Sequence, residues 1–299
     1  MSEARDVLDR AREVTEFLFA QEWSDGLPVV PATPAGVEAM LRGTRRDRDE
    51  VIGALAPGWG KATVERIAVN GLMAGCKPEY MPVLIAAVQA VADERYGLQG
   101  TQGTTDCIAP LLVVNGPTAG RLGFNGGAGC FGHGTRANAT VGRAICLMLL
   151  TLGGALPGRM KKSTLSQPGT YSYCIAENAA ASPWEPLHVE RGFSLEASTV
   201  TAMAATPMYQ VSDHCNATAE GFLTTLCDFH GRAGELQPVP RGRERRHAPP
   251  GVHGRVPPRG VEQAGRQGLC ARARSADNWG DEEGGRVGSG DAPSPAARG

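Results

Sequence analysis

Apolar residues recur at the spacing of an α-helix in several parts of the chain. One such stretch places Val64, Ile67 and Leu72 on the same helical face. Another begins at Pro78 and is apolar on nearly every side, which predicts a buried helix. On these grounds, and on cap and breaker residues, helices are predicted at residues 3–20, 33–41, 61–75, 78–96, 137–152 and 217–229.

Shorter apolar runs predict β-strands. They lie at 110–115 (PLLVVN), 171–176 (YSYCIA) and 198–205 (STVTAMAA). The charged run at 42–50 is expected to form a solvated surface loop. Because helices and strands both recur, we expect residues 1–230 to form a single globular α/β or α+β domain, with a glycine-rich loop before a buried helix.

The composition changes after residue 230. Residues 231–299 contain two leucines and no Ile, Met, Phe or Tyr. Such a segment buries too little apolar surface to offset its ordering entropy, so we expect a disordered tail rich in Arg, Gly and Pro. When residues 249–263 are back-translated, a one-nucleotide shift of the reading frame can encode a peptide whose apolar residues are spaced as in a folded domain. We hypothesise that the reading frame shifts near residue 230, which the coding DNA would decide.

Charge limits the classes of partner. Residues 1–230 carry 18 basic and 23 acidic residues, and phosphate binding needs clustered cations, so nucleic acid is not expected as a partner. The longest apolar stretch, 144–156, is too short to span a bilayer, and the charged start has no signal-peptide core. We therefore expect a cytoplasmic protein with no membrane partner, and we leave homo-oligomerisation open.

Cys76 is a candidate nucleophile. It lies between two predicted helices, next to Lys77 and three residues before Glu79. A nearby cation or a helix N-terminus lowers the pKa of a thiol and populates the thiolate. The alternative is that Cys76 is a small buried apolar residue. None of the eight cysteines forms a C-x-x-C pair, which argues against a zinc ribbon or a thioredoxin-type redox pair.

A candidate ligand loop lies directly before the helix predicted at 137–152. Glycines crowd residues 123–134, and Gly126 and Gly127 would let a ligand approach the backbone. Free N–H groups at the following helix start favour an anion, which Arg136 and Arg143 would also bind. The loop matches neither a P-loop nor a dinucleotide fingerprint, so the ligand stays unspecified. Tight packing for structural reasons is the alternative.

Two further segments carry groups that can transfer protons. The first is 177–191, which includes Glu177 and His188 in an expected loop; a surface loop with internal hydrogen bonds is the alternative. The second is His214 between Asp213 and Cys215, where the aspartate would either orient the imidazole or cap the next helix. A metal site would require distant histidines to meet, so no metal is predicted, and no cofactor is identified.

Four stretches together resemble a known family. They are EWSDGLPVVPATPAGVEAML, ATVERIAVNGLMAGCKPEYMPVLIAAVQA, NGPTAGRLGFNGGAGCFGHGTRANATVGRA and AENAAASPWEPLHVERGF. Over about residues 20–230 the chain resembles uncharacterised bacterial proteins, loosely labelled thioredoxin-like, that accompany proteins with a selenocysteine/cysteine-Gly-Ser-Cys (UGSC) motif. The resemblance implies importance for Cys76, Glu79, Asn125, Arg136, Asn138, Glu177, Trp184, Glu185, His188 and His214. Cys130 and Cys215 depart from the family pattern, as does the tail.

These features support two main hypotheses. The first is an enzyme acting on a small anionic or thiol-containing metabolite, with Cys76 as nucleophile, His188 or His214 as acid/base and the glycine-rich loop binding the anion. It requires Cys76 and the loop to line one pocket. The second is a non-catalytic binding module for a UGSC-type partner protein. A third hypothesis is an inactive copy that lacks its native C-terminal part.

Overall fold

The computed structural model describes residues 2–235 and 252–256, with side chains for residues 10–229. The chain divides into Met1–Arg259 and Gly260–Gly299, and the second unit lies outside the described residues. The helices of the first unit are α1 (Ser2–Ala20), α2 (Pro34–Leu41), α3 (Val64–Met73), α4 (Met81–Ala92), α5 (Leu98–Gly103), α6 (Pro117–Leu122), α7 (Arg136–Thr151), α8 (Leu187–Glu190) and α9 (Ala219–Glu235), with 3-10 turns η1 (Pro78–Tyr80), η2 (Glu94–Tyr96) and η3 (Pro168–Thr170). The strands are β1 (Val51–Leu55), β2 (Gly60–Thr63), β3 (Ala109–Asn115), β4 (Cys174–Ala176), β5 (Ser198–Ala205) and β6 (Val252–Val256).

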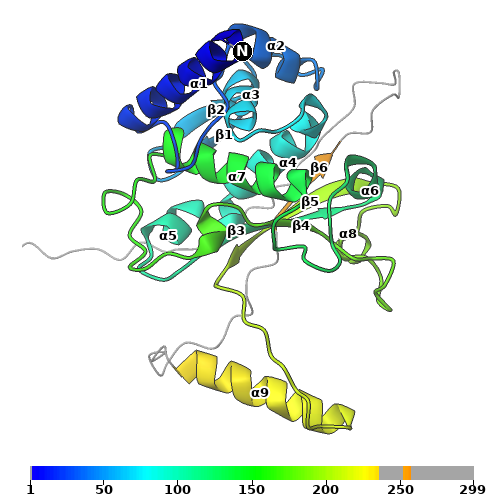
Figure 1. The fold of residues 1–299 in the computed structure, drawn as a ribbon. Helices are drawn as coiled ribbons and strands as arrows, with labels where there is room; N and C mark the ends of the chain where they lie inside the picture. The colour runs from blue at the N-terminus through cyan, green and yellow to red at the C-terminus, as the bar shows by residue number, and fades with distance from the viewer. Residues whose placement is uncertain (1, 236–251, 257–299) are drawn as a thin grey trace, which may run out of the picture. The chain divides into compact units, whose positions relative to one another are not determined.

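A four-stranded mixed sheet in the order β4-β3-β5-β6 forms the centre of the domain (Figure 1). Strand β3 pairs in parallel with β4, with Leu112 opposite Cys174. On its other edge β3 runs antiparallel to β5, with Asn115 opposite Thr199. The parallel pairing places the carboxyl ends of β3 and β4 at the same edge of the sheet.

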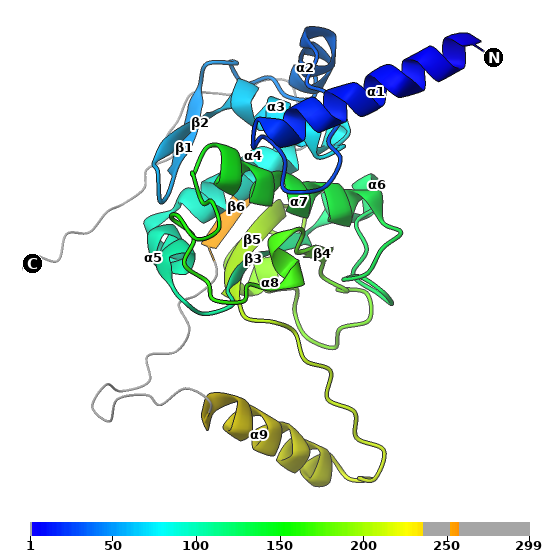
Figure 2. The same ribbon diagram turned by 60° about the vertical axis from the view of Figure 1, so that its left-hand side comes forward.

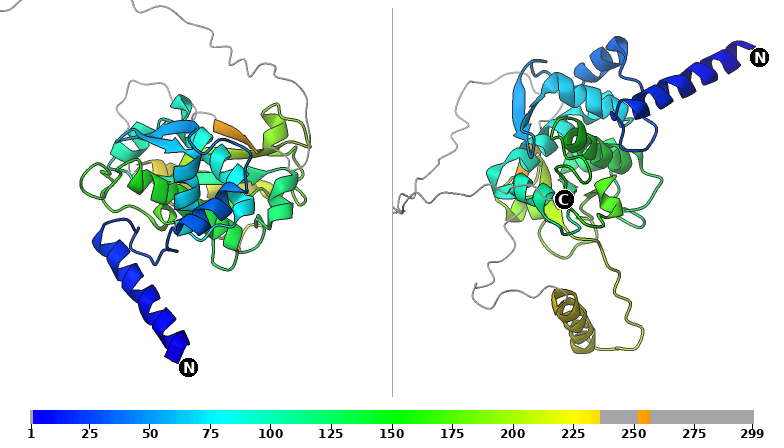
Figure 3. Two further views of the ribbon diagram at one scale, coloured as in Figure 1. Left: turned by 90° about the horizontal axis from the view of Figure 1, so that it is seen from above. Right: turned by 90° about the vertical axis from the view of Figure 1, so that its left-hand side faces the viewer.

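Helix α4 is buried along its length, as its uniformly apolar sequence predicts. It packs against β5 and β6 of the sheet, against β1 of the β1–β2 hairpin, and against α3 and α7 (Figures 1 and 2). Figure 3 shows the same helices from above and from one side. Burying a single Val, Leu or Ile side chain contributes about 1.5–3 kcal/mol, so α4 accounts for a large share of the core.

The predicted fold class is confirmed as one α/β domain, and most predicted elements are present. Strand β5 matches its predicted residues, and Thr33 caps α2 by accepting a hydrogen bond from the Gly36 N–H at 3.2 Å. Three predictions were too long. Residues 61–63 belong to β2 rather than to α3, and the helix predicted at 78–96 is α4 at 81–92 with the 3-10 turns η1 and η2 at its two ends. Strand β4 contains only the last three residues of 171–176. Strand β1, which sequence patterning missed, pairs with β2.

The tail prediction needs one correction. Residues 252–256 form β6, which pairs with β5, and α9 extends to Glu235. A segment can add to the edge of a sheet through its backbone hydrogen bonds, with little burial of side chains. The amino-acid composition of the segment therefore does not reveal this pairing. The rest of the predicted disordered tail lies outside the described residues. Of the helices that the structure describes, none is both long and apolar enough to cross a membrane.

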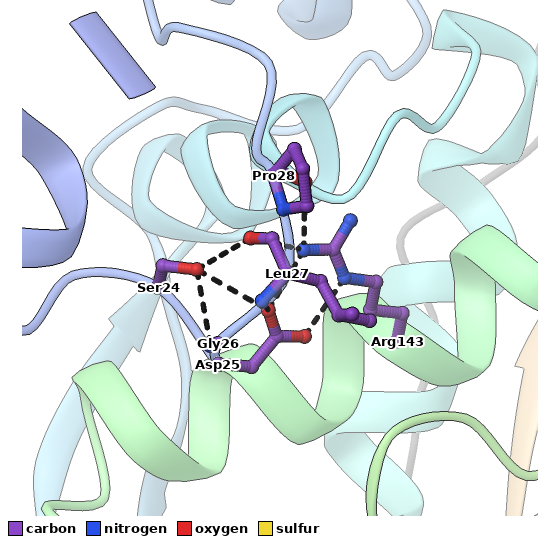
Figure 4. Close-up of polar contacts among 6 residues, drawn as sticks. All are labelled: Ser24, Asp25, Gly26, Leu27, Pro28 and Arg143. Atoms are coloured by element: carbon purple, nitrogen blue, oxygen red, sulfur yellow. Dashed lines mark hydrogen bonds and ion pairs between the residues drawn. The ribbon is translucent and has the colours of Figure 1, made fainter. Parts of the chain in front are cut away.

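A buried ion pair fixes the segment between α1 and α2 to α7. The Arg143 guanidinium donates to both carboxylate oxygens of Asp25, at 2.8 and 2.7 Å (Figure 4). It also donates to the carbonyl oxygens of Leu27, at 3.2 Å, and Pro28, at 2.9 Å. The two charged side chains are only 15% and 11% exposed, so the pair is largely shielded from water.

We expect Arg143→Met to lower the free energy of unfolding by about 2–3 kcal/mol, because it leaves Asp25 as an unpaired, nearly buried charge. Adding Asp25→Asn should recover part of that loss by removing the unpaired charge. Urea unfolding followed by circular dichroism measures both changes. Arg159→Met is the control, since Arg159 forms an exposed pair with Glu22 at 3.6 Å, and exposed pairs contribute little. Equal losses for Arg143→Met and Arg159→Met would contradict this interpretation.

Candidate functional site

A cleft of about 460 Å³ opens at the carboxyl ends of β3 and β4. In open sheets with parallel strands, ligands bind at this edge because the strand ends and the following loops leave a crevice there. Side chains from three sequence regions line the cleft: Asn115, Gly116, Pro117, Ala119, Gly120, Phe124, Gly126, Ala176, Glu177, Asn178, Ala179, Ala180, Pro186, His188, Leu195 and Glu196. Two of the predicted catalytic residues, Glu177 and His188, therefore meet in one site.

Glu177 directly follows β4 and is held by two donors. The Asn115 side-chain amide donates through Nδ2 to the carboxylate, from the end of the neighbouring strand β3. The backbone N–H of Leu187, the first residue of α8, donates to the same carboxylate at 3.0 Å. These contacts orient the half-buried carboxylate at the wall of the cleft.

His188 lies on α8 and is 2% exposed. Its Nε2 lies 3.3 Å from the carbonyl oxygen of Leu195, which can only accept a hydrogen bond, so the proton of the neutral ring is assigned to Nε2. Nδ1 then carries a lone pair, and it has no hydrogen-bond partner among residues 10–229. His188, a residue of the cleft lining, therefore carries a buried proton acceptor without a described partner.

A second unpaired acceptor lies beside it on β3. Asn115 is 2% exposed, and because its Nδ2 donates to Glu177, its Oδ1 is the atom left over. Neither this oxygen nor the hydroxyl of Thr199, opposite Asn115 on β5, has a partner among the described side chains. An unsatisfied buried polar group costs about 1–3 kcal/mol, so buried polar atoms without a described partner are concentrated at this edge of the sheet at some cost in stability.

The glycine-rich loop contributes to the cleft through Gly126 but not through Gly127. A Cβ on Gly126 would lie 2.4 Å from the Ala176 carbonyl oxygen, so only glycine fits against the end of β4. Asn138, 3% exposed, accepts from the Asn125 N–H at 2.9 Å and donates to the carbonyl oxygens of Asn125 and Cys130. The side chain of Asn125 bonds within the loop itself, to Gly127 N and Ala128 O. Asn125 and Asn138 thus hold the loop in shape, as the structural alternative predicted.

The anion site predicted at the start of α7 is not assembled in this structure. Arg136 donates through Nε and a terminal nitrogen to the Gly75 carbonyl oxygen, at 3.0 and 2.8 Å. Arg143 is occupied by Asp25 and the neighbouring carbonyl groups. Neither arginine lines the cleft, because each is used to fix a preceding segment of the chain.

Cys76 is a buried thiol and does not line the cleft. Burial raises the pKa of Cys76 to about 12, and the Thr140 side chain and the Arg136 charge offset this only in part. The expected thiolate is therefore not supported, since the side chain is 4% exposed and the desolvation of the charged form dominates. The rings of Tyr80 and Phe124 are in tilted contact, with centroids 6.0 Å apart, and of the two only Phe124 lines the cleft.

The remaining predicted residues lie outside the cleft. Glu79 is half-buried, while Trp184, 79% exposed, and Glu185 face solvent. His214 is exposed, and its neighbour Asp213 accepts from the N–H groups of Cys215 and Asn216, each at 3.0 Å. Hydrogen bonds from Asn216 lower the pKa of Asp213 to about 2, so this aspartate orders the turn before α9. It does not cap the helix as the alternative predicted, because Thr218 accepts from the Gly221 N–H in the first turn of α9 at 3.2 Å. Among the described side chains, no group of His, Cys, Asp and Glu is arranged to hold a metal ion.

Sequence analysis missed Asn115 and Glu196. Asn115 is the last residue of the predicted strand PLLVVN, and a polar residue at the end of a buried strand was the signal that could have identified it. Glu196 gave no comparable signal. It lies in the irregular segment between α8 and β5, and only the tertiary path of that segment brings it to the cleft.

We expect Cys76 to react slowly with iodoacetamide at pH 8, because a thiol with its pKa raised to about 12 is neutral there and also shielded from the reagent. Peptide mass spectrometry at successive times measures the reaction, and the exposed Cys215 is the control that should react at the rate of an ordinary thiol. Rapid labelling of Cys76 in the folded protein would contradict a buried thiol.

Asn138→Ala should lower the free energy of unfolding by about 2–3 kcal/mol, because it leaves the Asn125 N–H and the carbonyl oxygens of Asn125 and Cys130 without their partner. Asn178→Ala is the matched control, since Asn178 is exposed. Chemical denaturation compares the two variants. A loss below about 0.5 kcal/mol for Asn138→Ala, the size of ordinary surface changes, would show that the loop does not depend on this side chain.

Comparison with known proteins adds no further assignment. No protein-family model, curated protein or solved structure matches this chain. The resemblance to proteins that accompany UGSC-motif partners stays a prediction, and the functional proposal below rests on the geometry of the cleft.

Proposed function

We propose that the protein is an enzyme that binds a small metabolite at the carboxyl ends of β3 and β4 and transfers a proton from that metabolite to His188. The observation that carries the proposal is that Glu177, His188 and Asn115 line one cleft while two buried acceptors there lack partners. A structural role alone would favour satisfying these atoms within the protein.

The charge of the cleft indicates the class of ligand. Glu177 and Glu196 line it, and no Lys or Arg is present in the described lining. The unpaired atoms Asn115 Oδ1 and His188 Nδ1 are hydrogen-bond acceptors. We therefore propose a neutral or cationic ligand with hydroxyl or amino groups, in place of the anion expected from the glycine-rich loop.

Each residue has a distinct role in this proposal. Asn115 and the Leu187 N–H fix the Glu177 carboxylate, which binds a hydroxyl or ammonium group of the ligand. His188 accepts the transferred proton at Nδ1, while the contact from Nε2 to the Leu195 oxygen keeps the ring in the required tautomer. Cys76 is part of the buried core and takes no part in the chemistry.

The proposal is tested first by binding. A panel of small polyols, amino alcohols and primary amines is screened by thermal shift, with matched carboxylates and phosphates alongside. We expect the compounds that stabilise the protein to be hydroxyl or amino compounds, and Glu177→Gln to weaken their binding by tenfold or more, about 1.4 kcal/mol. Glu185→Gln, an exposed carboxylate in the same segment, should change the affinity less than twofold.

Turnover is tested with the same compounds. Loss or exchange of substrate protons is followed by proton NMR, and His188→Gln should abolish it while the thermal shift produced by the ligand remains. Ligands that bind Glu177→Gln and the unaltered protein equally would overturn the assignment of the cleft.

The second hypothesis, a binding module for a UGSC-type partner, keeps one supporting observation. Two large apolar side chains near this site are strongly exposed, Trp184 at 79% and Leu195 at 63%, and exposed apolar residues are frequent at protein interfaces. Co-purification with such a partner that is lost in Trp184→Ser, while the ligand screen stays negative, would favour this function over catalysis.

A further inference from the structure

A second cleft, of about 490 Å³, lies at the other end of β3. It touches Pro110 near the start of the strand, whereas the first cleft touches Asn115 at its end. Most of its lining comes from α7 and from the long segment between α7 and β4, with one residue each from the segment before α2, from α5 and from β3: Asp25, Gln102, Pro110, Cys146, Leu149, Leu150, Ala155, Pro157, Lys161, Ser163, Leu165, Ser166, Gln167, Pro168, Thr170 and Tyr171.

Lys161 is the basic residue in the described lining of this cleft. Its backbone is fixed, because its N–H donates to the Leu156 carbonyl oxygen at 3.1 Å and its own carbonyl oxygen accepts from the Gly158 N–H at 3.1 Å. Its half-buried side chain has no carboxylate within ion-pair distance among residues 10–229. The positive charge is therefore held at the cleft wall without a counter-ion from the described part of the chain.

The neighbouring groups do not neutralise Lys161. Asp25 is the acidic residue of the lining, and both of its oxygens are bound by Arg143. The Cys146 thiol is neutral at physiological pH, because burial raises the pKa of Cys146 to about 12. Burial also lowers the pKa of Lys161, as desolvation disfavours an ammonium group that lacks a partner.

The rest of the wall combines apolar surface with a few polar groups. Leu149, Leu150 and Ala155 form apolar surface on one side. The amide of Gln102, a residue that is only 3% exposed, offers both a donor and an acceptor. Ser166 has φ of 60°, a left-handed conformation that costs free energy for a residue other than glycine and is found preferentially at binding sites.

We propose that this cleft binds a small carboxylate with an apolar body, with the Lys161 ammonium group as its counter-ion. The carboxylate supplies the negative charge that Lys161 lacks, and its apolar part lies against Leu149, Leu150 and Ala155. Apolar pockets with a few placed polar groups are the usual form of a small-molecule site, and this volume is in their range. The site is separate from the acidic cleft at the end of β3 and does not depend on the function proposed for it.

Benzoate is the probe, and benzamide is its neutral counterpart of the same shape. Isothermal titration calorimetry on the full chain should show saturable benzoate binding that weakens tenfold or more in Lys161→Gln. Lys162→Gln is the matched control, since Lys162 is adjacent, exposed and absent from the lining, and it should bind benzoate as the unaltered protein does. Glu177→Gln should also leave benzoate binding unchanged, which separates this site from the first cleft.

A second measurement is made on the unaltered sequence, and the variant Lys161→Gln serves only to assign the signal. Lysines are labelled with ¹³C-methyl groups, and the Lys161 signal, assigned with Lys161→Gln, is followed by NMR as pH changes. We expect benzoate to raise the pKa of Lys161, because a bound carboxylate stabilises the ammonium form, and benzamide to leave it unchanged. No saturable benzoate binding, equal affinity in Lys161→Gln, or a Lys161 pKa that benzoate does not move would each overturn the proposal.

Discussion

The fold depends on covering one helix that is apolar on every side. Helix α4 has no polar face to present to water, so elements must surround it: β5 and β6 of the sheet, β1 of the hairpin, and α3 and α7. Sequence neighbours cannot do this alone, because α4 is followed only by short helical turns before β3. Burial of α4 therefore requires segments from both earlier and later in the chain to pack against it, and β5 and β6 of the sheet are among them.

Strand β3 organises both candidate sites through its position in that sheet. Its parallel pairing with β4 brings Asn115 and Glu177 together, although they are 62 residues apart in the chain. Its first half contributes Pro110 to the cleft that contains Lys161. The two clefts differ in charge, since one is lined by Glu177 and Glu196 and the other holds Lys161, which has no counter-ion among the described side chains. This difference indicates different ligands.

Three of the polar residues that the sequence suggested as ligand-binding groups stabilise the scaffold instead. Arg136 fixes the turn at Gly75, Arg143 fixes the segment at Asp25, and Asn138 fixes the glycine-rich loop. Each joins separate segments of the chain through side-chain hydrogen bonds, and those to the backbone satisfy carbonyl or N–H groups outside regular helices and strands. Arginine and asparagine are as well suited to joining segments of the chain as they are to binding a ligand. Only the group to which the side chain bonds in the structure distinguishes these two roles.

The sequence by itself determined the α/β class, the buried helix at α4, the strands β3 and β5, and the helix after the glycine-rich loop, because hydrophobic periodicity and cap residues are local signals. It also predicted Glu177 and His188 as candidate proton-transferring groups, but not that they share a cleft with Asn115. Only the tertiary structure decided this, as it decided that Cys76 is buried and that Lys161 has no described counter-ion. Burial, charge pairing and the meeting of strand ends depend on contacts between residues far apart in the chain, and a single sequence holds no local signal for them.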